Sequence, residues 1–413
     1  MVFGLLKIIE AADLCPPISA EEGLQLGSGD QPTDFDMAES MTKSPAREST
    51  LTSDDTMRQL VDIWKEILRV ESVGIDQNYF DLGGDSVTAV RMFAEIEKVF
   101  KVRLPLATLF EAPTVEELAR LVRQGAEESD WWSLVPIQPM GSRPPFFCVH
   151  GAGGNVLIYR DLSECLGSDQ PFYGLQAQGL DGSRPVLTTI EDMAALYVKE
   201  IRRVQRHGPY LLGGYCMGGT IAFEMAQRLV SEGERVALLA LFDTMDWSKL
   251  KTPSVWDKAY FSVERFGFHA ANFLRLDHAG KWKFLSEKAR ALKNRIPVWR
   301  GMLLEMLDND SHSSASGSKL LAQIWRANDH ACVNYHPEPY PGPISDFRPM
   351  KQYRMYDHPD AKWNSLARGG QEIIILPVYP AGMLLEPFVR LLAAALRKAI
   401  DDASGNSQRT STY

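Results

Sequence analysis

The sequence has no apolar run that approaches the roughly 18 residues that a membrane helix needs. It also has no tract of basic residues, and its net charge is −9 over 413 residues. A nucleic-acid-binding domain usually carries a basic patch, because the phosphates must be neutralised. We therefore expect neither a membrane nor a nucleic acid as a partner.

The chain also has little cysteine and little histidine. Its five cysteines are widely spaced and form neither a Cys-x-x-Cys pair nor a disulfide framework, which favours a reducing compartment. The N-terminal segment lacks the basic region and the small-residue cleavage site of a secretory signal. No pair among the eight histidines has metal-ligand spacing with a third ligand nearby. We expect a cytoplasmic protein without a metal.

The first third of the chain contains three segments of different composition. Residues 1–53 are predicted to be a disordered leader, since most of this segment is rich in Pro, Ser, Thr, Gly and acidic residues without apolar periodicity. The acidic stretch QGAEESDWW predicts a flexible linker over 126–135. Between the two, apolar residues recur at helical spacing, and Thr114 with Glu117 forms a capping box before a last helix. This pattern predicts a bundle of three to four helices over 54–125.

The stretch YLLGGYCMGGTIAFEM, at residues 210–225, organises the rest of the chain. An apolar strand pattern runs into Gly214-Tyr215-Cys216-Met217-Gly218, and a helical pattern follows at once. Strand, sharp turn and helix form the context in which Gly-x-nucleophile-x-Gly is a nucleophile elbow. The glycines permit a strained turn and a close approach of the two backbones. The alternative is that Cys216 is a buried, inert cysteine.

Strand and helix patterns alternate from residue 136 to residue 402, which predicts an α/β domain with a mostly parallel sheet. The apolar run at 236–242 suits a parallel strand that is buried on both faces. Residues 247–321 depart from the alternation and are rich in aromatic and basic side chains. We expect residues 403–413 to be a disordered tail.

The helical segment carries a specific resemblance. Tyr79–Ser86, reading YFDLGGDS, resembles the attachment motif of peptidyl and acyl carrier domains, and LPL at 104–106 and LFEAPT at 109–114 match the same family. The resemblance implies a four-helix carrier bundle with 4'-phosphopantetheine attached covalently to Ser86. We expect Ser86 at a helix N-terminus, where free N–H groups and the helix dipole favour a phosphodiester. The alternative is a serine that only caps the helix.

The larger domain resembles the α/β-hydrolase thioesterase domains that end many nonribosomal peptide and polyketide synthetases. The elbow and the strand with its glycine-rich loop at Pro145–Gly154 carry this resemblance. A carrier followed by a thioesterase is the usual terminal order in that family. The resemblance implies that residues 247–321 form a helical lid over an apolar acyl channel. An aromatic core of additional helices is the alternative.

The family's catalytic roles fall on four residues of this sequence. Cys216 takes the position of the nucleophile, where serine is commoner, and Asp243 takes the position of the triad acid. The resemblance assigns the oxyanion hole to the N–H groups of Ala152 and Met217. For Asp243, the alternative is a plain turn residue at the end of a strand.

The family's histidine is missing. Pro380 stands at its place, in the loop between the last strand pattern and the last helix pattern. His358, which follows the predicted strand at 343–348, is the candidate substitute for the catalytic base. We expect His150 to shape the oxyanion loop, and the other histidines have no motif context.

The cysteine and the missing histidine are connected by their chemistry. A thiol is partly ionised near neutral pH, and a helix N-terminus lowers its pKa, so a cysteine can accept an acyl group without a histidine. Removing that group with water is harder, because a general base contributes roughly 10²–10⁴-fold. We therefore expect slow loading and a preference for transfer to a good nucleophile over hydrolysis.

Together these patterns predict a carrier–thioesterase release unit of secondary-metabolite biosynthesis. An acyl or peptidyl thioester on Ser86 would pass to Cys216 and leave by hydrolysis, cyclisation or transfer to an acceptor. The expected partners are a phosphopantetheinyl transferase and an upstream synthetase or acyl-loading enzyme. The alternative is a catalytically degenerate domain that only docks or protects the carrier-bound chain. A free-standing hydrolase of small esters is disfavoured by the fused carrier.

Overall fold

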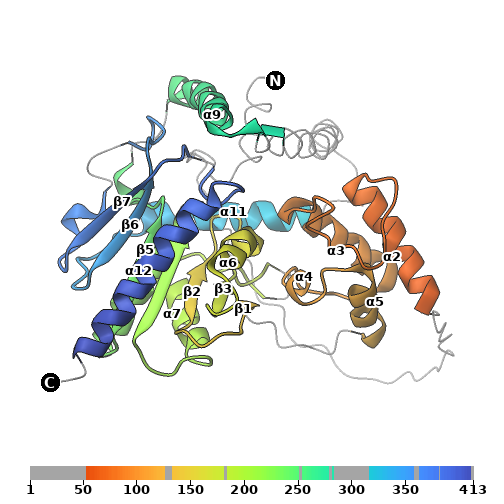
Figure 1. The fold of residues 1–413 in the computed structure, drawn as a ribbon, viewed down its shortest axis with the longest axis horizontal. Helices are drawn as coiled ribbons and strands as arrows, with labels where there is room; N and C mark the ends of the chain where they lie inside the picture. The colour runs from red at the N-terminus through yellow and green to blue at the C-terminus, as the bar shows by residue number, and fades with distance from the viewer. Residues whose placement is uncertain are drawn as a thin grey trace, which may run out of the picture.

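The computed structural model describes residues 53–125, 133–180, 184–250, 254–278, 281–282, 316–357, 362–380 and 382–410. Apart from Ser53, the predicted leader lies outside the described residues, as do most of the predicted linker and the middle of the predicted lid. The described residues form a small helical bundle and a larger α/β domain (Figure 1).

The small domain is the predicted helical bundle. Its helices are α2 (Ser53–Leu68), α3 (Ser86–Phe100), α4 (Thr108–Glu111) and α5 (Val115–Gln124). Trp64 and Tyr79 are fully buried and meet edge to face with ring centroids 5.3 Å apart. The predicted capping box is present, because Thr114 Oγ1 accepts from the Glu117 N–H while the Glu117 carboxylate accepts from the Thr114 N–H.

The large domain is built on one seven-stranded sheet with the order β1-β3-β2-β4-β5-β6-β7. The strands are β1 (Leu134–Gln138), β2 (Phe146–Val149), β3 (Phe172–Leu175), β4 (Tyr210–Tyr215), β5 (Val236–Phe242), β6 (Ile344–Pro349) and β7 (Gln371–Leu376). Only β1 pairs antiparallel, with β3, and the other neighbours are parallel. The predicted fold class, a mostly parallel α/β domain beside a helical bundle, is confirmed.

Helices cover the sheet. The helix α6 (Arg160–Leu166) packs against α12 (Val389–Thr410), and α7 (Ile190–Ile201) packs against α8 (Met217–Ser231). In Figure 1, α12 crosses in front of the sheet. All six residues of β4 are buried, as a central parallel strand requires.

Several boundaries differ from the sequence prediction. The last helix begins at Val389 instead of near Met383, because Pro387 lacks an N–H and disfavours helical geometry in the residue before it. Residues 403–410, predicted as tail, continue α12, since extending an existing helix costs little. The helix α11 (Ser316–Asn334) begins within the predicted lid and continues beyond its predicted end at residue 321. The strand β1 and the helix α6 were not predicted.

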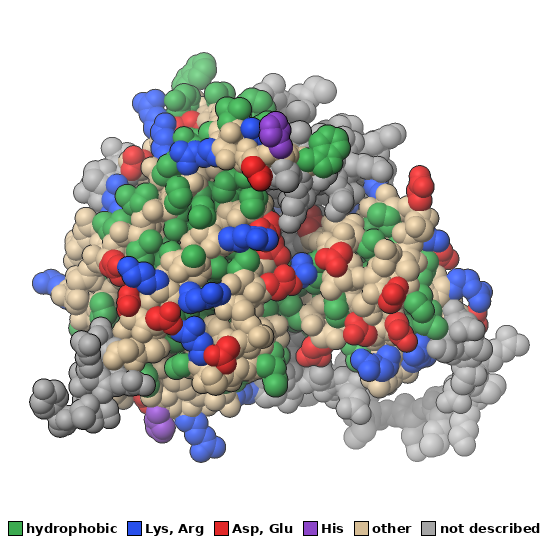
Figure 2. Space-filling model, in the orientation of Figure 1, with side chains coloured by type: hydrophobic (Ala, Val, Ile, Leu, Met, Phe, Trp, Pro, Cys, Tyr) green, Lys and Arg blue, Asp and Glu red, His purple; other side chains and the backbone are tan. Residues whose placement is uncertain are grey.

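The predicted lid is helical where it is described. It contains the short η2 (Trp247–Lys249), α9 (Val255–Arg275) and the start of α11. One side of α9 buries Phe261 and Phe268 against Tyr353, which fits the aromatic-core alternative. The opposite side is exposed, and Figure 2 shows hydrophobic side chains gathered at this end of the molecule.

The two domains meet at Arg160, the first residue of α6. Its guanidinium lies 4.6 Å from the centre of the Phe80 ring and 4.0 Å from the Asp81 carboxylate. On its own helix it pairs with Glu164 at 2.8 Å. Leu157, just before α6, belongs to the buried core of the bundle. A pocket of about 370 Å³ at this junction is lined by residues of both domains, Arg160 and Phe80 among them.

Arg160→Glu should weaken the attachment of the bundle to the α/β domain and let the two domains separate more often. The variant loses the contact with the Phe80 ring and places a carboxylate beside Asp81 and Glu164, and each such contact is worth about 0.5–1 kcal/mol. The radius of gyration measured by small-angle scattering should increase. Arg206→Glu makes the same charge change at an exposed position and should leave it unchanged. If both variants have the same radius of gyration, Arg160 does not hold the two domains together.

Candidate active site

Cys216 occupies the turn between β4 and α8. Its backbone has φ 55° and ψ −120°, a strained conformation for a residue with a side chain. A Cβ on Gly214 would lie 2.2 Å from the carbonyl carbon of Gly218, and a Cβ on Gly218 would lie 2.2 Å from the Val149 carbonyl oxygen. Both glycines are therefore needed for the close approach of strand, turn and helix. The predicted strand–turn–helix elbow is present, with the side chain of Cys216 only 3% exposed.

Strand pairing brings Asp243 to the same edge of the sheet. Tyr215 and Phe242 are paired in the register of β4 and β5, so the next residues, Cys216 and Asp243, both follow the ends of neighbouring strands. The N–H of Cys216 donates to the Phe242 carbonyl at 2.9 Å. Asp243 also has a positive φ, of 47°, and its N–H donates to the Phe347 carbonyl at 2.9 Å. The backbone thus holds both residues firmly at this edge.

The N–H groups of Ala152 and Met217 are both available. Within the described part of the chain, neither donates a hydrogen bond to a protein acceptor. Met217 is the first residue of α8, where helical N–H groups lack an intrahelical partner. The carbonyl of Ala152 accepts from Asn328 Nδ2 of α11 at 2.8 Å, which fixes the loop. Two buried donors beside an elbow form the usual arrangement of an oxyanion hole.

Asp243 has a glutamine as its partner where a triad has a histidine. Gln352 Nε2 donates to Asp243 Oδ1, and Gln352 Oε1 accepts from the Tyr353 N–H at 2.8 Å. Burial is the main cause that raises the pKa of Asp243, to about 7. The hydrogen bond from Gln352 and the charge of Arg348 oppose the rise, and the Asp346 carboxylate adds to it. A glutamine side chain does not take up a proton at physiological pH, so Gln352 does not replace the histidine as a base.

The histidine position of the family is firmly occupied by other residues. Pro380 is buried, and the preceding Tyr379 is held by α9, since its N–H donates to Asn272 Oδ1 at 3.1 Å and its ring stacks on Phe268. His358, the predicted substitute, lies outside the described residues. Its role as a base stays a prediction.

His150 is structural, as the sequence suggested. Its ring is fully buried, with Nδ1 2.7 Å from the Gly151 carbonyl oxygen and Nε2 2.7 Å from the Tyr197 hydroxyl. Burial lowers its pKa to about 4, so the imidazole is neutral at physiological pH. Both ring nitrogens are engaged, and the ring braces the loop that carries Ala152.

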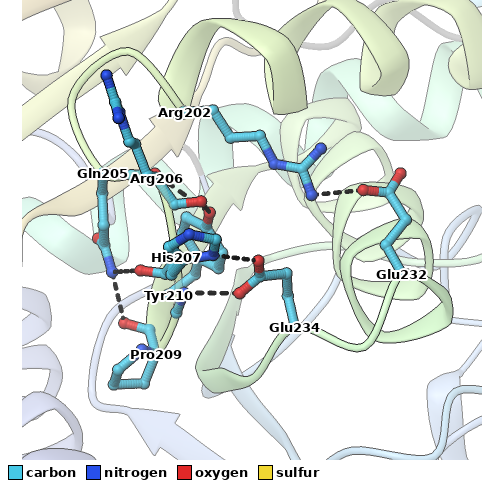
Figure 3. Close-up of polar contacts among 9 residues, drawn as sticks. Arg202, Gln205, Arg206, His207, Pro209, Tyr210, Glu232 and Glu234 are labelled. Carbon is cyan, nitrogen blue, oxygen red and sulfur yellow. Dashed lines mark hydrogen bonds and ion pairs between the residues drawn. The ribbon is translucent and has the colours of Figure 1, made fainter.

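His207 lies at the wrong end of the sheet to assist Cys216. It precedes β4, whereas Cys216 follows that strand, and six strand residues span about 20 Å. His207 Nδ1 lies 2.9 Å from Glu234 Oε1, within a polar cluster that also joins Arg202 to Glu232 (Figure 3). This cluster ties the turn before β4 to the residues before β5.

No motif in the sequence predicted that two further side chains, from α11, lie in the region of the elbow. Asp329 and Cys332 come from α11, a helix more than a hundred residues after the elbow. Cys332 is buried, and its pKa is raised by burial, by Cys216 and by Asp329. Neither residue lies in a motif, so only the packing of α11 could place them here.

In the bundle, Ser86 is the first residue of α3. The cap is provided by the preceding residue, since Asp85 Oδ1 accepts from the Thr88 N–H at 2.8 Å while Thr88 Oγ1 accepts from the Asp85 N–H. The alternative in which Ser86 caps the helix is therefore wrong. A Cβ on Gly84 would lie 2.2 Å from the ring of Tyr79, so this glycine lets the loop close over the core. The N-terminus of a 15-residue helix without acidic side chains in its first turn fits a phosphodiester.

No described helix is both long and apolar enough to pass through a membrane. In the same part of the chain, no group of three or more His, Cys, Asp and Glu side chains could hold a metal ion.

Two family models match this chain. Residues 58–122 match the phosphopantetheine attachment site, and residues 144–259 match the thioesterase domain. The chain thus contains a carrier domain followed by a thioesterase domain, and the first match implies a covalently attached 4'-phosphopantetheine.

Similar proteins are synthetases with much longer chains. Malpinin synthetase of Mortierella alpina is 47% identical over 187 residues, which are 45% of this chain and 2% of that synthetase. A dimodular nonribosomal peptide synthase of Bacillus subtilis is 44% identical over 184 residues, which are 45% of this chain and 8% of that synthase. This chain therefore spans a small part of the length of these relatives.

A solved structure supports the fold over most of the chain. The crystal structure of a four-domain nonribosomal peptide synthetase superposes with a TM-score of 0.53 at 24% sequence identity. The match covers 92% of this chain and 28% of that one. At this identity it supports the arrangement of helices and strands and nothing finer.

Asp243→Asn should stabilise the protein at high pH and much less at low pH. The folded-state pKa of Asp243 is raised to about 7, so between about pH 4 and pH 7 the native state keeps a proton that the unfolded state has lost. The free energy of unfolding of the wild type, relative to that of a variant whose side chain does not titrate, therefore falls as the pH rises through this window. The advantage of the variant in free energy of unfolding should grow by about 2 kcal/mol from pH 5 to pH 8.

Denaturant titrations at the two pH values measure this difference. Asp169→Asn is the matched control, because Ser142 donates to that carboxylate and lowers its pKa, so this variant should show no gain at pH 8. An Asp243→Asn advantage that is the same at both pH values would show that Asp243 is ionised in the native state.

Proposed function

We propose that this chain, with its carrier domain followed by a thioesterase domain, is a release unit of a nonribosomal peptide synthetase. Two residues, one in each domain, would carry this function. Ser86 would hold the phosphopantetheine, whose thiol carries the acyl or peptidyl chain as a thioester. Cys216 would receive that chain and release it to water, to an internal nucleophile or to an external acceptor.

The elbow geometry at Cys216 is the observation that carries this proposal. A cysteine in a strained turn, at the N-terminus of a 15-residue helix and beside two buried free N–H groups, has the environment of a covalent nucleophile. A purely structural cysteine in a core needs neither the strain nor the donors. The N–H groups of Ala152 and Met217 would bind the oxyanion that forms when Cys216 attacks a thioester carbonyl.

The side chains around the elbow favour a thiol over a hydroxyl. A serine needs an adjacent base to become a nucleophile, whereas a thiol ionises near neutral pH. In the described residues, the partner of Asp243 is Gln352, which cannot serve as that base. The substitution of cysteine for serine thus compensates for the absent histidine in the first half of the reaction. Asp243 keeps the position of the triad acid and orients the loop after β6 through Gln352.

The contacts between the two domains support transfer of the acyl chain from the carrier bundle to the α/β domain. The contacts of Arg160 with Phe80 and Asp81 hold the carrier domain against α6, and α11 extends from the α/β domain toward α3 (Figure 1). The helix α3 begins with Ser86, and α11 passes the elbow, so one helix contacts both parts of the proposed route. An upstream synthetase module and a phosphopantetheinyl transferase are the partners that this function needs.

A second function has an observation in its favour. Cys216 is only 3% exposed, and its neighbour Asp243 is bonded to a glutamine. A thioesterase domain that has lost activity could still dock the carrier and shield its cargo. Reaction of Cys216 with a thioester distinguishes the two functions.

Incubation with an acyl-N-acetylcysteamine thioester should acylate Cys216, as detected by peptide mass spectrometry. Cys216→Ala should abolish the adduct, and Cys216→Ser should reduce its rate of formation by at least about 10²-fold, because a hydroxyl requires the missing base. Cys165→Ala removes a more exposed thiol and should leave acylation intact.

Loading of the carrier provides the internal reference. A phosphopantetheinyl transferase with acyl-coenzyme A should modify the wild type and not Ser86→Ala. If Ser86 loads normally and Cys216 stays unmodified, the docking function is correct and the release function is wrong.

A further inference from the structure

Two hydrogen bonds define the path of α11 past the elbow. Asn328 Nδ2 donates to the Ala152 carbonyl at 2.8 Å, and the hydroxyl of Tyr335, just after α11, donates to Glu224 Oε2 at 2.8 Å. Ala152 lies in the loop beside the elbow, and Glu224 lies two turns into α8. The helix α11 therefore runs alongside α8 in the same direction. Its residues between these two anchors lie level with the first turns of α8, which Cys216 precedes.

Asp329 and Cys332 lie between the anchors. They are three residues apart, so their side chains share one side of α11. Cys332 is close enough to both Cys216 and Asp329 that each raises the pKa of its thiol. The electrostatics agree with the path set by the hydrogen bonds in placing Cys332 near Cys216. Because Asp329 shares one side of α11 with Cys332, one turn nearer the Ala152 anchor, that path brings its carboxylate toward the elbow.

The release reaction proposed above gives no role to the carboxyl of Asp329. Among the described residues it has no hydrogen-bond or ion-pair partner, although its side chain is largely removed from solvent. Burial alone raises its pKa to about 7. The charged residues of the elements packed against α11, such as Lys249 of η2, Arg228 of α8 and Arg91 of α3, do not contribute to this shift. A buried carboxyl without a partner is costly unless it has a function.

We propose that Asp329 is the catalytic base of this site and accepts the proton of the nucleophile that attacks the acyl group on Cys216. The inference rests on the proposed release function and supplies the base that Pro380 removes. No other described carboxyl is better placed, because Asp243 is engaged by Gln352 and Asp346 is fully buried beside Arg348.

Release of the acyl group from Cys216 needs no reactant other than water. A water molecule attacks the carbonyl carbon of the thioester on Cys216, a C–O bond forms, and the Asp329 carboxylate takes the water proton. The oxyanion is held by the N–H groups of Ala152 and Met217. Collapse of the intermediate breaks the C–S bond, and the Asp329 carboxyl returns the proton to the Cys216 thiolate. The products are a carboxylic acid and a free thiol, and an amine or alcohol can replace water.

The experiment separates acylation from deacylation. The full-length protein is acylated on Cys216 with an acyl-N-acetylcysteamine thioester, excess reagent is removed, and loss of the adduct is followed by mass spectrometry from pH 5 to pH 9. The base must be ionised to act, so the wild-type rate should rise with pH to a plateau with a midpoint near pH 7. Asp329→Asn should lower the plateau rate by about 10²–10⁴-fold and remove this midpoint.

Three further measurements distinguish a catalytic role of Asp329 from a structural one. Asp329→Glu keeps the carboxylate and should restore part of the rate together with a midpoint. Hydroxylamine, a nucleophile that needs little deprotonation, should remove the adduct from Asp329→Asn at nearly the wild-type rate. Thermal unfolding shows whether the variants are folded.

The outcomes are distinct. A variant Asp329→Asn that deacylates with the wild-type rate and midpoint overturns the inference and leaves the release function intact. The inference is also overturned if Asp243→Asn, and not Asp329→Asn, removes the midpoint. If Cys216 of the wild type is never acylated, the release function itself fails, and the assignment of Asp329 fails with it.

Discussion

The close contact between β4 and α8 is the constraint on which the rest of this structure depends. The strand must turn into the helix within one residue, and Gly214 and Gly218 leave no room for a Cβ. The residue between them is consequently held at a positive φ, with its N–H engaged by the neighbouring strand. This turn fixes the position of Cys216 before any catalytic partner is considered. It also places the free N–H of Met217 beside the sulfur.

Around this turn, the polar groups are arranged differently from those of a serine triad. The acid at the end of β5 is paired with an amide, and the position expected for histidine holds a buried proline. The helix α11 carries a carboxyl, Asp329, that has no partner among the described residues. Both Asp243 and Asp329 have pKa values raised by burial toward neutrality. Proton transfer at this site would therefore depend on carboxyl groups tuned by desolvation, and a thiol nucleophile suits such weak assistance.

The two domains are joined by a charged contact and by apolar ones. Arg160 joins α6 to Phe80 and Asp81, and Leu157 lies in the core of the bundle. Leu106 of the bundle packs against the cluster that contains Ile324 of α11. The same helix, α11, contacts α3 and holds the loop of Ala152 through Asn328. It thereby connects the carrier domain to the surroundings of the elbow.

The sequence by itself determined the elements whose signal is local. Apolar periodicity and the capping box at Thr114 predicted the bundle, and the glycines around Cys216 predicted the elbow, because backbone sterics leave few other solutions there. Short edge elements such as β1 were missed, and so was the length of α12, since their stability comes from neighbours distant in the chain. Only the tertiary structure decided the partners of the site. Gln352 and Asp329 carry no motif, and it is the packing of loops and of α11 against the sheet edge that brings them to the cysteine.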